Sequence, residues 1–251
     1  MLFRRIKTHF KKQDWSGVAL DLLVVVVGVF LGLQAANWNE ERNDRAREKN
    51  VLAALSADLA ETQEQLTRLL ENNRDGSRSL RTLVERIDGN EGSMPLQELD
   101  RHVFLGLYLV PNFVPTNFTY EELLNTGRLD VITNSGLRQR LQRLSSSTDL
   151  VKKQADDLVA MAFDHSDRYL IEHYDFRGIA PQQSPTYGVV LDWVDPDSNR
   201  RSVEGIVNDP VFVNLALYRA RLNQVFNRDA VRLIEEMTTI QQIIAVELSE
   251  D

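Results

Sequence analysis

Twenty consecutive residues, from Gly17 to Ala36, constrain this chain most, because they read GVALDLLVVVVGVFLGLQAA and contain a single charged side chain, Asp21. About twenty helical residues span the roughly 30 Å hydrocarbon core of a bilayer. An isolated helix of this composition exposes its apolar side chains to water unless lipid or protein covers it. We therefore expect a transmembrane anchor over residues 17–38 that contacts the lipid bilayer.

The flanks of this span predict its orientation. Residues 1–16 hold five basic side chains against one acidic side chain: Arg4, Arg5, Lys7, Lys11 and Lys12 against Asp14. By the positive-inside rule, residues 1–16 form a cytoplasmic basic tail and the C-terminal part is exported. Trp15 and Trp38 flank the span, where indole rings favour the membrane interface.

A cleaved signal peptide is the main alternative to a retained anchor, because a basic segment followed by the apolar run Leu22 to Leu33 suits both. Signal cleavage requires small residues at the first and third positions before the cut. A cut after Ala35 places Leu33 at the third position, and a cut after Ala36 places Gln34 there. The pattern therefore favours retention of the span.

Within the span, Gly28 and Gly32 form a G-x-x-x-G spacing on the helix face that also carries Asp21. This spacing lets two helices approach closely, so one interpretation is a homodimer formed through the transmembrane helix. The other interpretation is that the glycines occur by chance in a valine-rich anchor and that Asp21 snorkels towards water. The sequence leaves both open.

Beyond the span, apolar residues recur at helical spacing in three stretches. The first is a heptad seam, typical of a bundle or coiled coil, through Leu52, Leu55, Leu59, Thr62, Leu66, Leu69, Asn73, Gly76, Leu80, Leu83 and Ile87. The second runs through Leu137, Leu141, Leu144, Thr148, Val151, Ala155, Leu158, Ala162, His165 and Tyr169. The third runs through Leu215, Tyr218, Leu222, Phe226, Ala230, Leu233, Met237, Ile240 and Ile244.

These seams predict three long amphipathic helices that pack antiparallel around one core, with shorter helices near residues 96–109 and 119–126. We expect a kink or break near Gly76, an end to the first helix in the segment DGNEGSMP from Asp88, and an N-cap at Asn134 before the second seam. The predicted class is mainly α: one transmembrane helix, then an exported helical bundle over residues 39–251.

Residues 177–207 form an insertion that loses helical periodicity, holds three prolines and contains the β-like run Tyr187 to Trp193. We expect a long loop or small hairpin. Long loops are uncommon unless functional, so this is the segment most suited to contact a partner, although a simple connector is the competing interpretation.

The chain has a net charge of -8, and the basic tail leaves the remainder more acidic still. Nucleic acid is therefore not expected as a partner, because phosphate binding requires a basic face. The sequence contains no cysteine, which excludes disulfides, Cys-ligated metal centres and thiol catalysis.

The run DLLVVVVGVFLGLQAANWNEER, from Asp21 to Arg42, closely resembles the N-terminal signature of a bacterial membrane-anchored family catalogued as domain of unknown function 6090. A second stretch, FTYEELLNTGRLDVITNSGLRQRL at 118–141, resembles another pattern of that family. The matching residues include Gln34, Asn37, Trp38, Asn39 and Glu40 in the first stretch and Tyr120, Glu122, Leu123, Gly127, Leu129 and Ile132 in the second. Asp21 replaces the usual Glu, and Thr126 replaces a serine. The resemblance implies a single-pass anchor in the bacterial inner membrane with a helical periplasmic or extracellular domain, and it supplies no activity.

The second stretch also makes sense as a packed corner. Thr119 and Glu122 fit a capping box, and Gly127 fits the left-handed position after a helix end. Leu129 and Ile132 then return the chain to the core. We therefore interpret these residues as structural rather than as a ligand site.

Residues that could carry chemistry do not form a recognisable site. His165 and His173 are eight residues apart, about 12 Å along a helix, which is too far for one metal ion without other ligands. Asp195, Asp197 and Asn199 imitate the start of a calcium loop, but Arg200 occupies the glycine position that such a loop requires, so we assign them to a turn. Ser145, Ser146 and Ser147 lie on a predicted helix without nucleophile-elbow glycines. No catalytic residue, metal ligand or cofactor is predicted.

These observations favour a non-enzymatic scaffold or accessory subunit that binds an unidentified envelope protein. A sensor of small periplasmic ligands is the alternative; its cytoplasmic tail is too short for an output domain, so it would signal through a partner. A hydrolase assembled from acids far apart in the sequence is a third reading, since spatial neighbours are invisible in a sequence.

Overall fold

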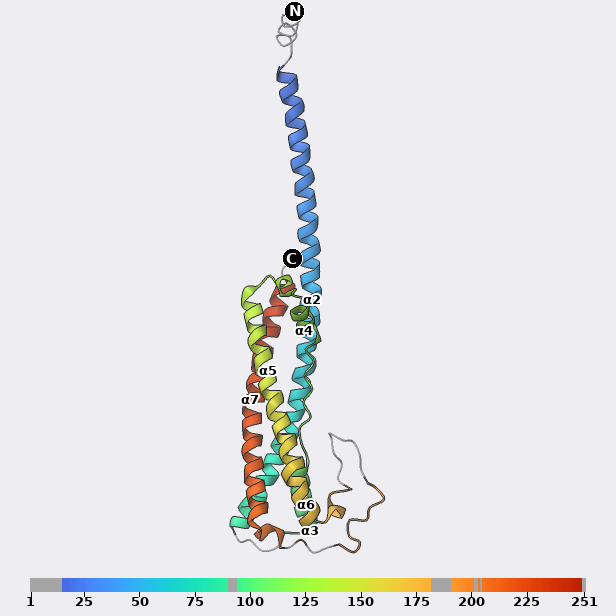
Figure 1. Ribbon diagram of the computed structural model, residues 1–251, viewed down its shortest axis with the longest axis vertical. Helices are drawn as coiled ribbons and strands as arrows, with labels where there is room; N and C mark the ends of the chain where they lie inside the picture. Colours follow the sequence, from blue (N-terminus) through green and yellow to red (C-terminus); the bar gives the residue numbers. More distant parts are fainter. Residues whose placement is uncertain (1–14, 90–93, 182–190, 201–202, 204, 250–251) are drawn as a thin grey trace, which may run out of the picture. The chain divides into compact units, whose positions relative to one another are not determined.

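The computed structural model describes residues 15–89, 94–181, 191–200, 203 and 205–249, with the backbone alone for 15–19 and 21. The basic tail thus lies outside the described residues, apart from the backbone at its C-terminal end. Within the described ranges the chain is mainly helical and contains no strand, which confirms the mainly α part of the prediction (Figure 1). The elements are α2 (Trp15–Asp88), α3 (Leu96–Val103), η2 (Phe104–Tyr108), α4 (Phe118–Asn125), η3 (Leu129–Val131), α5 (Ser135–Met161), η4 (Ala162–Ser166), α6 (Asp167–His173), η5 (Phe176–Gly178), η6 (Ile206–Asn208) and α7 (Pro210–Ser249).

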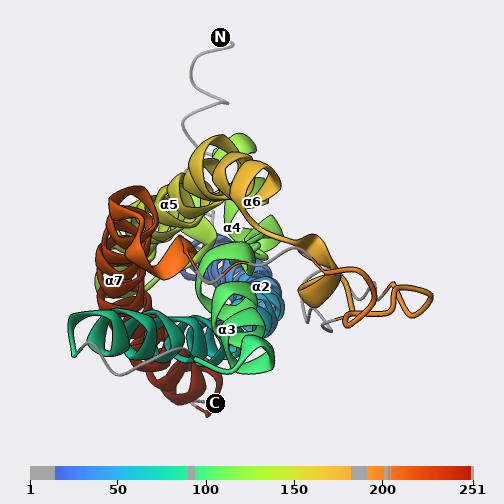
Figure 2. The same cartoon turned by 90° about the horizontal axis from the view of Figure 1, so that it is seen from below.

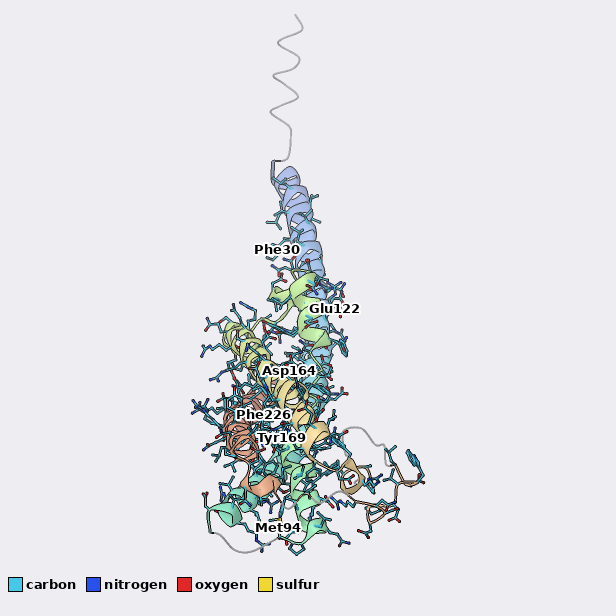
Figure 3. The ribbon with its side chains drawn as sticks, turned by 60° about the horizontal axis from the view of Figure 1, so that its bottom comes forward. Phe30, Met94, Glu122, Asp164, Tyr169 and Phe226 are labelled. Atoms are coloured by element: carbon cyan, nitrogen blue, oxygen red, sulfur yellow. The ribbon has the colours of Figure 1, made fainter. Side chains whose placement is uncertain are left out.

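The structure divides after Asn50 into two units, and the first contains the N-terminal part of α2. Every large apolar side chain from Leu20 to Leu33 is between 46% and 64% exposed. Figure 3 labels one of them, Phe30, on this uncovered stretch. α2 is therefore long enough and apolar enough to span a membrane. No described part of the chain buries its apolar stretch.

The second unit, Val51–Asp251, is built from three long helical segments: the remainder of α2, α5 and α7. They lie lengthwise side by side and surround a common centre when viewed along their axes (Figures 1 and 2). α7 runs antiparallel to the other two, whereas α2 and α5 run in the same direction. The chain can return between α2 and α5 because Leu109–Asn117 is an extended segment without regular secondary structure.

The first seam is buried as predicted, with Ile87 only partly so. α2 continues through Gly76 and ends at Asp88, so the helix is not broken at Gly76, and the expected end is right. A Cβ atom at Gly76 would lie 2.6 Å from the carbonyl oxygen of Leu105. This glycine therefore permits η2 to approach α2 closely and does not interrupt the helix.

The residues of the second seam are buried as far as Ala162, whereas His165 is exposed. The cause is η4, a π-helical turn, in which backbone bonds run from i to i+5 and one extra residue is accommodated. Ser166 consequently takes the inward position and is 0% exposed. The inward seam position predicted for His165 is therefore wrong.

The third seam holds from Phe226 onward but is displaced before it. Tyr218 is 53% exposed, although the seam places it inward. The buried positions lie one residue later than those expected at 215, 218 and 222, namely Ala216, Arg219 and Asn223. Two of the three are polar, which is why apolar periodicity selected their neighbours.

The insertion is irregular in its described residues. Residues 187–190 of the expected β-like run lie outside them, and Leu191–Trp193 form no strand. Asp195–Asn199 make a turn, as assigned from sequence, with Asp197 N donating to Asp195 Oδ1 at 3.0 Å. Trp193 is 79% exposed.

Candidate functional site

The corner predicted over residues 118–132 is present in the structure. Gly127 has a φ of +67°, the left-handed conformation expected of it. Its N–H donates to Leu124 O at 3.1 Å, and Arg128 N–H donates to Leu123 O at 2.9 Å. These two bonds form a Schellman motif, which satisfies the last carbonyls of α4. Tyr120 and Leu123 are buried beside the core, Ile132 is 0% exposed and Leu129 packs against them.

The start of this corner differs from the prediction. α4 begins at Phe118 with Asn117 in the cap position, so Thr119 and Glu122 do not form a capping box. Instead Asp58, on α2, accepts a hydrogen bond from Thr119 N at 2.8 Å through Oδ2. A carboxylate at a helix N-terminus satisfies a free donor and complements the helix dipole. The cap is supplied from 61 residues away, where a local motif search does not look.

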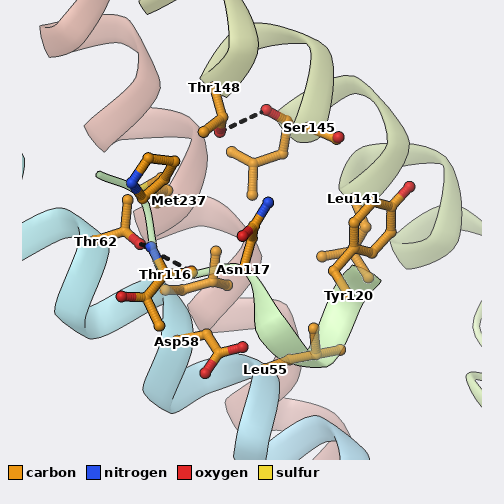
Figure 4. A pocket seen from close by; sticks show the side chains of 13 residues that line it. Leu55, Asp58, Thr62, Thr116, Asn117, Tyr120, Leu141, Ser145, Thr148 and Met237 are labelled. Carbon is orange, nitrogen blue, oxygen red and sulfur yellow. Dashed lines mark hydrogen bonds between the residues drawn. The ribbon is translucent and has the colours of Figure 1, made fainter. Parts of the chain in front are cut away.

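A small cavity of about 40 Å³ lies between this corner, α2, α5 and α7 (Figure 4). Leucine side chains and Met237 line it together with polar groups such as Asp58, Thr62 and Thr148. Thr148 donates to Leu144 O at 2.9 Å, and Thr62 pairs with the backbone of Thr116, so these hydroxyls already have partners. A space of this size holds a few water molecules at most. Tyr120, Leu123, Gly127, Leu129 and Ile132 thus have packing or backbone roles in this corner, whereas Glu122 is exposed.

The extended segment Leu109–Asn117 lies between helices, so its buried backbone groups need partners that a neighbouring strand would normally supply. Thr62 provides two of them, since its hydroxyl donates to Thr116 O and accepts from Thr116 N, each at 3.0 Å. Gln65 pairs likewise with Val114 when its amide nitrogen donates to the carbonyl (2.7 Å) and its oxygen accepts from the N–H (3.2 Å). Side chains of α2 therefore make the hydrogen bonds that a neighbouring strand would make in a β-sheet.

Arg219 on α7 also bonds this segment, and at 1% exposure it is the largest fully buried side chain among the described residues. Its Nη2 donates to Leu109 O at 2.7 Å, its Nη1 to Leu158 O at 3.1 Å and its Nε to Asn223 Oδ1 at 3.1 Å. Burial lowers the pKa of Arg219 to about 10, and Asp167 opposes the shift. The guanidinium therefore joins the extended segment, α5 and α7 at one point.

Asp167 follows η4 and lines a second, larger cavity of about 200 Å³. The other lining residues are Tyr108, Val110, Ala162 and Phe163. Asp167 Oδ1 is enclosed and accepts no hydrogen bond from any described residue. Burial raises the pKa of Asp167, while the charge of Arg219 opposes the rise. Sequence analysis missed both charged residues, because neither belongs to a recognisable motif.

A third polar cluster connects the insertion to α3 through an ion pair. Asp100 and Arg200 have side chains only 4% and 6% exposed. Arg200 Nη1 donates to Asp100 Oδ2 at 2.6 Å, Nη2 bonds Asp100 Oδ1, and the Tyr174 hydroxyl donates to the same carboxylate at 2.6 Å. Hydrogen bonding to Asp100 raises the pKa of Arg200, and burial raises that of Tyr174. Gly178 lies beside the pair, where an added Cβ would collide with both side chains.

The site residues predicted in the anchor lie along α2. Cβ atoms added to Gly28 and Gly32 would meet no described atom within 4 Å, so this face is open to lipid or to another helix. Trp38 is 67% exposed, and the other motif residues from Gln34 to Glu40 are exposed as well. The side chains of Trp15 and Asp21 lie outside the described residues.

The remaining sequence candidates stay apart. His165 and His173 are both exposed. Among the described residues, no three His, Asp or Glu side chains group as metal ligands do. Ser147 lies on α5 and donates to Glu236 at 3.2 Å.

Comparison with protein-family models, with curated proteins and with solved structures found no match to this chain.

Proposed function

We propose that this chain is a single-pass protein of the bacterial inner membrane, whose helical region beyond the anchor serves as a non-enzymatic scaffold or accessory subunit for another envelope protein. The observation that carries the proposal is the uncovered apolar stretch of α2. In a water-soluble protein such a helix packs its apolar side chains inside. Here those side chains remain exposed, and the same helix continues into the folded region.

The free energy of insertion supports anchoring by this stretch. Eleven Leu, Val and Phe side chains are exposed between Leu20 and Leu33. Each favours insertion by about 0.3 to 0.6 kcal/mol, roughly 3 to 7 kcal/mol together. The basic residues before Trp15 support a cytoplasmic N terminus, and therefore a periplasmic or extracellular location for the second unit.

Membrane fractionation of intact cells tests the anchor. Val26→Arg with Phe30→Arg places two charges near the middle of the span, at a cost of roughly 5 to 7 kcal/mol, which cancels the insertion energy. We expect the wild-type chain in the alkali-resistant membrane pellet and the double variant in the soluble or degraded pool. A matched control, Leu150→Arg with Val246→Arg, alters equally exposed apolar positions of the second unit and should remain in the membrane.

A full-length wild-type chain in the soluble fraction would contradict the anchor, as would a mature N terminus beginning after Ala36. The second result would instead indicate a cleaved signal peptide.

The scaffold role is tested by photo-crosslinking in cells. Trp193 in the insertion is 79% exposed and Leu150 on α5 is 50% exposed, so a crosslinking residue at either site is accessible. We expect one defined adduct from position 193 and none from position 150, followed by identification of the adduct by mass spectrometry. A chain that migrates as a monomer in native electrophoresis and gives no adduct from position 193 would contradict this role.

A further inference from the structure

The insertion presents a large aromatic side chain to solvent. Trp193 is 79% exposed, which makes it the most exposed of the large hydrophobic side chains that the structure describes. Tryptophan is highly buried on average in folded proteins, and it is among the residues most enriched at the hot spots of protein interfaces. Figures 1 and 2 show the described part of the insertion projecting sideways from the three long helices. The position of Trp193 therefore suits contact with another molecule.

Hydrogen bonds hold the chain on both sides of Trp193. Leu191 N donates to Ala180 O at 3.1 Å, and Val194 N donates to Leu191 O at 3.0 Å, which closes a turn that contains Trp193. On the C-terminal side, the buried ion pair described above connects the insertion to α3. A side chain on a fixed turn loses less conformational freedom when it binds than one on a flexible loop. The indole is thus presented in a preorganised position.

The charges around Trp193 indicate the chemistry of a partner. Asp192, Asp195 and Asp197 lie within four residues of it and are exposed, and no basic residue occurs from position 191 to 199. Negative charge therefore surrounds the indole along the chain. Complementary potentials give an interface its specificity and speed its association, so the matching surface carries Lys or Arg around an apolar pocket.

Two arginines bond the chain next to this turn, and both have carboxylate partners. Arg200 is buried in its pair with Asp100. Arg177 donates to Asn199 O at 3.4 Å and pairs with Asp175 at 3.2 Å. These arginines therefore leave the acidic side chains of the turn available to a basic partner.

The same charges disfavour other occupants. Anionic lipid headgroups attract basic segments, so an acidic turn is poorly suited to insert its indole into a membrane surface. A second copy of this chain would bring like charge, because the net charge is -8 even with the basic tail included. A protein with a basic surface is the occupant that complements the turn.

We propose that Trp193 inserts into an apolar pocket rimmed by Lys and Arg on the partner protein, with Asp192 and Asp197 facing the basic rim. This inference rests on the proposed scaffold function and names the kind of surface that the scaffold binds.

Photo-crosslinking in intact cells tests this contact, with the photoreactive residue at position 198, so that Trp193 and the three acids stay unchanged. Ser198 is exposed and belongs to the adjoining turn. We expect one defined protein adduct. The peptide linked to position 198, sequenced by mass spectrometry, should contain more Lys and Arg than Asp and Glu.

Variants of the aromatic anchor test its part in the contact. Trp193→Ala should lower the adduct yield about tenfold or more, because loss of a tryptophan hot spot lowers affinity by about 30-fold. Phe118→Ala is the matched control, since it removes an aromatic ring that is 74% exposed on α4, and it should leave the yield unchanged.

Variants of the acids test the charge complementarity. Asp192→Asn with Asp197→Asn should lower the yield about threefold or more, because it removes two charges that face the basic rim. Asp195 stays unchanged, since its Oδ1 accepts the Asp197 N–H and shapes the turn. Glu122→Gln with Asp130→Asn removes two exposed acids elsewhere and should have no effect.

The inference is overturned by an adduct to lipid or to a second copy of the chain, by a linked peptide in which acids equal or outnumber Lys and Arg, or by equal yields from the wild-type chain and Trp193→Ala. It is also overturned if the chain migrates as a complex in native electrophoresis but gives no adduct from position 198; in that case the scaffold function stands and only this contact is wrong. A monomer without adducts from positions 193 and 198 overturns both.

Discussion

Removal of one partner of the Asp100–Arg200 pair should destabilise the second unit strongly. In Asp100→Leu, the Arg200 guanidinium loses both of its bonds to the carboxylate and stays in a site where its side chain is 6% exposed. The Tyr174 hydroxyl loses its acceptor as well. An uncompensated buried charge costs about 3 to 5 kcal/mol. Because domains are stable by only about 5 to 15 kcal/mol, this loss should be visible in any unfolding experiment.

A double-mutant cycle separates the pair from its surroundings. Arg200→Met alone should cost a similar amount, since it leaves the carboxylate of Asp100 buried. Asp100→Leu with Arg200→Met removes both charges and should cost less than the sum of the single variants by at least about 2 kcal/mol. Urea unfolding of the full chain in detergent, followed by circular dichroism, measures all four. Single variants that each cost less than about 1 kcal/mol and combine additively would refute the reasoning.

Other sites give further tests. Gly127→Val should lose about 1 to 2 kcal/mol of unfolding free energy, because a φ of +67° is unfavourable for a residue with a side chain. The control Gly205→Ala should lose none, because Gly205 has a φ of -74° and open space around it. Equal effects of the two variants in thermal melts would contradict this. Hydrogen bonding from Arg228 lowers the pKa of Asp229 to about 2, so the stability it confers is present above about pH 4 and lost as the pH falls towards 2. Asp229→Asn should flatten that part of a stability–pH curve, and an unchanged slope would argue against it. Arg219→Met should cost about 2 to 4 kcal/mol, since the bond to the buried Leu109 carbonyl disappears; a loss below about 0.5 kcal/mol in urea would show that the bond is dispensable.

Sequence patterns predicted the structural features that depend on residues close together in the sequence. Apolar spacing located the three long helices, and local chemistry located the end of α2 and the start of α5. Asn134 caps α5 by accepting from Leu137 N at 2.9 Å, as its position before the seam indicated. Gly127 adopts the left-handed conformation that only glycine enters readily. In each case the residues that interact are at most a few positions apart.

The features that the sequence did not predict depend on residues far apart in the sequence. Asp58 caps α4 from 61 residues away, and Asp100 pairs with Arg200 across 100 residues. No periodicity connects such positions. At Arg219 the pattern was misleading as well, because a buried arginine reads as a surface residue and moves the apparent seam onto Tyr218.

One structural cause accounts for the buried charge on α7. The segment Leu109–Asn117 runs extended between helices, so its backbone groups must be satisfied by side chains, and Arg219 is placed inward on α7 to bond Leu109 O. Arg219 in turn requires a compensating charge, which Asp167 supplies only in part because the two interact without a direct bond. The enclosed oxygen of Asp167 is then left with an acceptor position free. The irregular segment therefore accounts for the buried guanidinium of Arg219 and for the enclosed carboxylate that interacts with it.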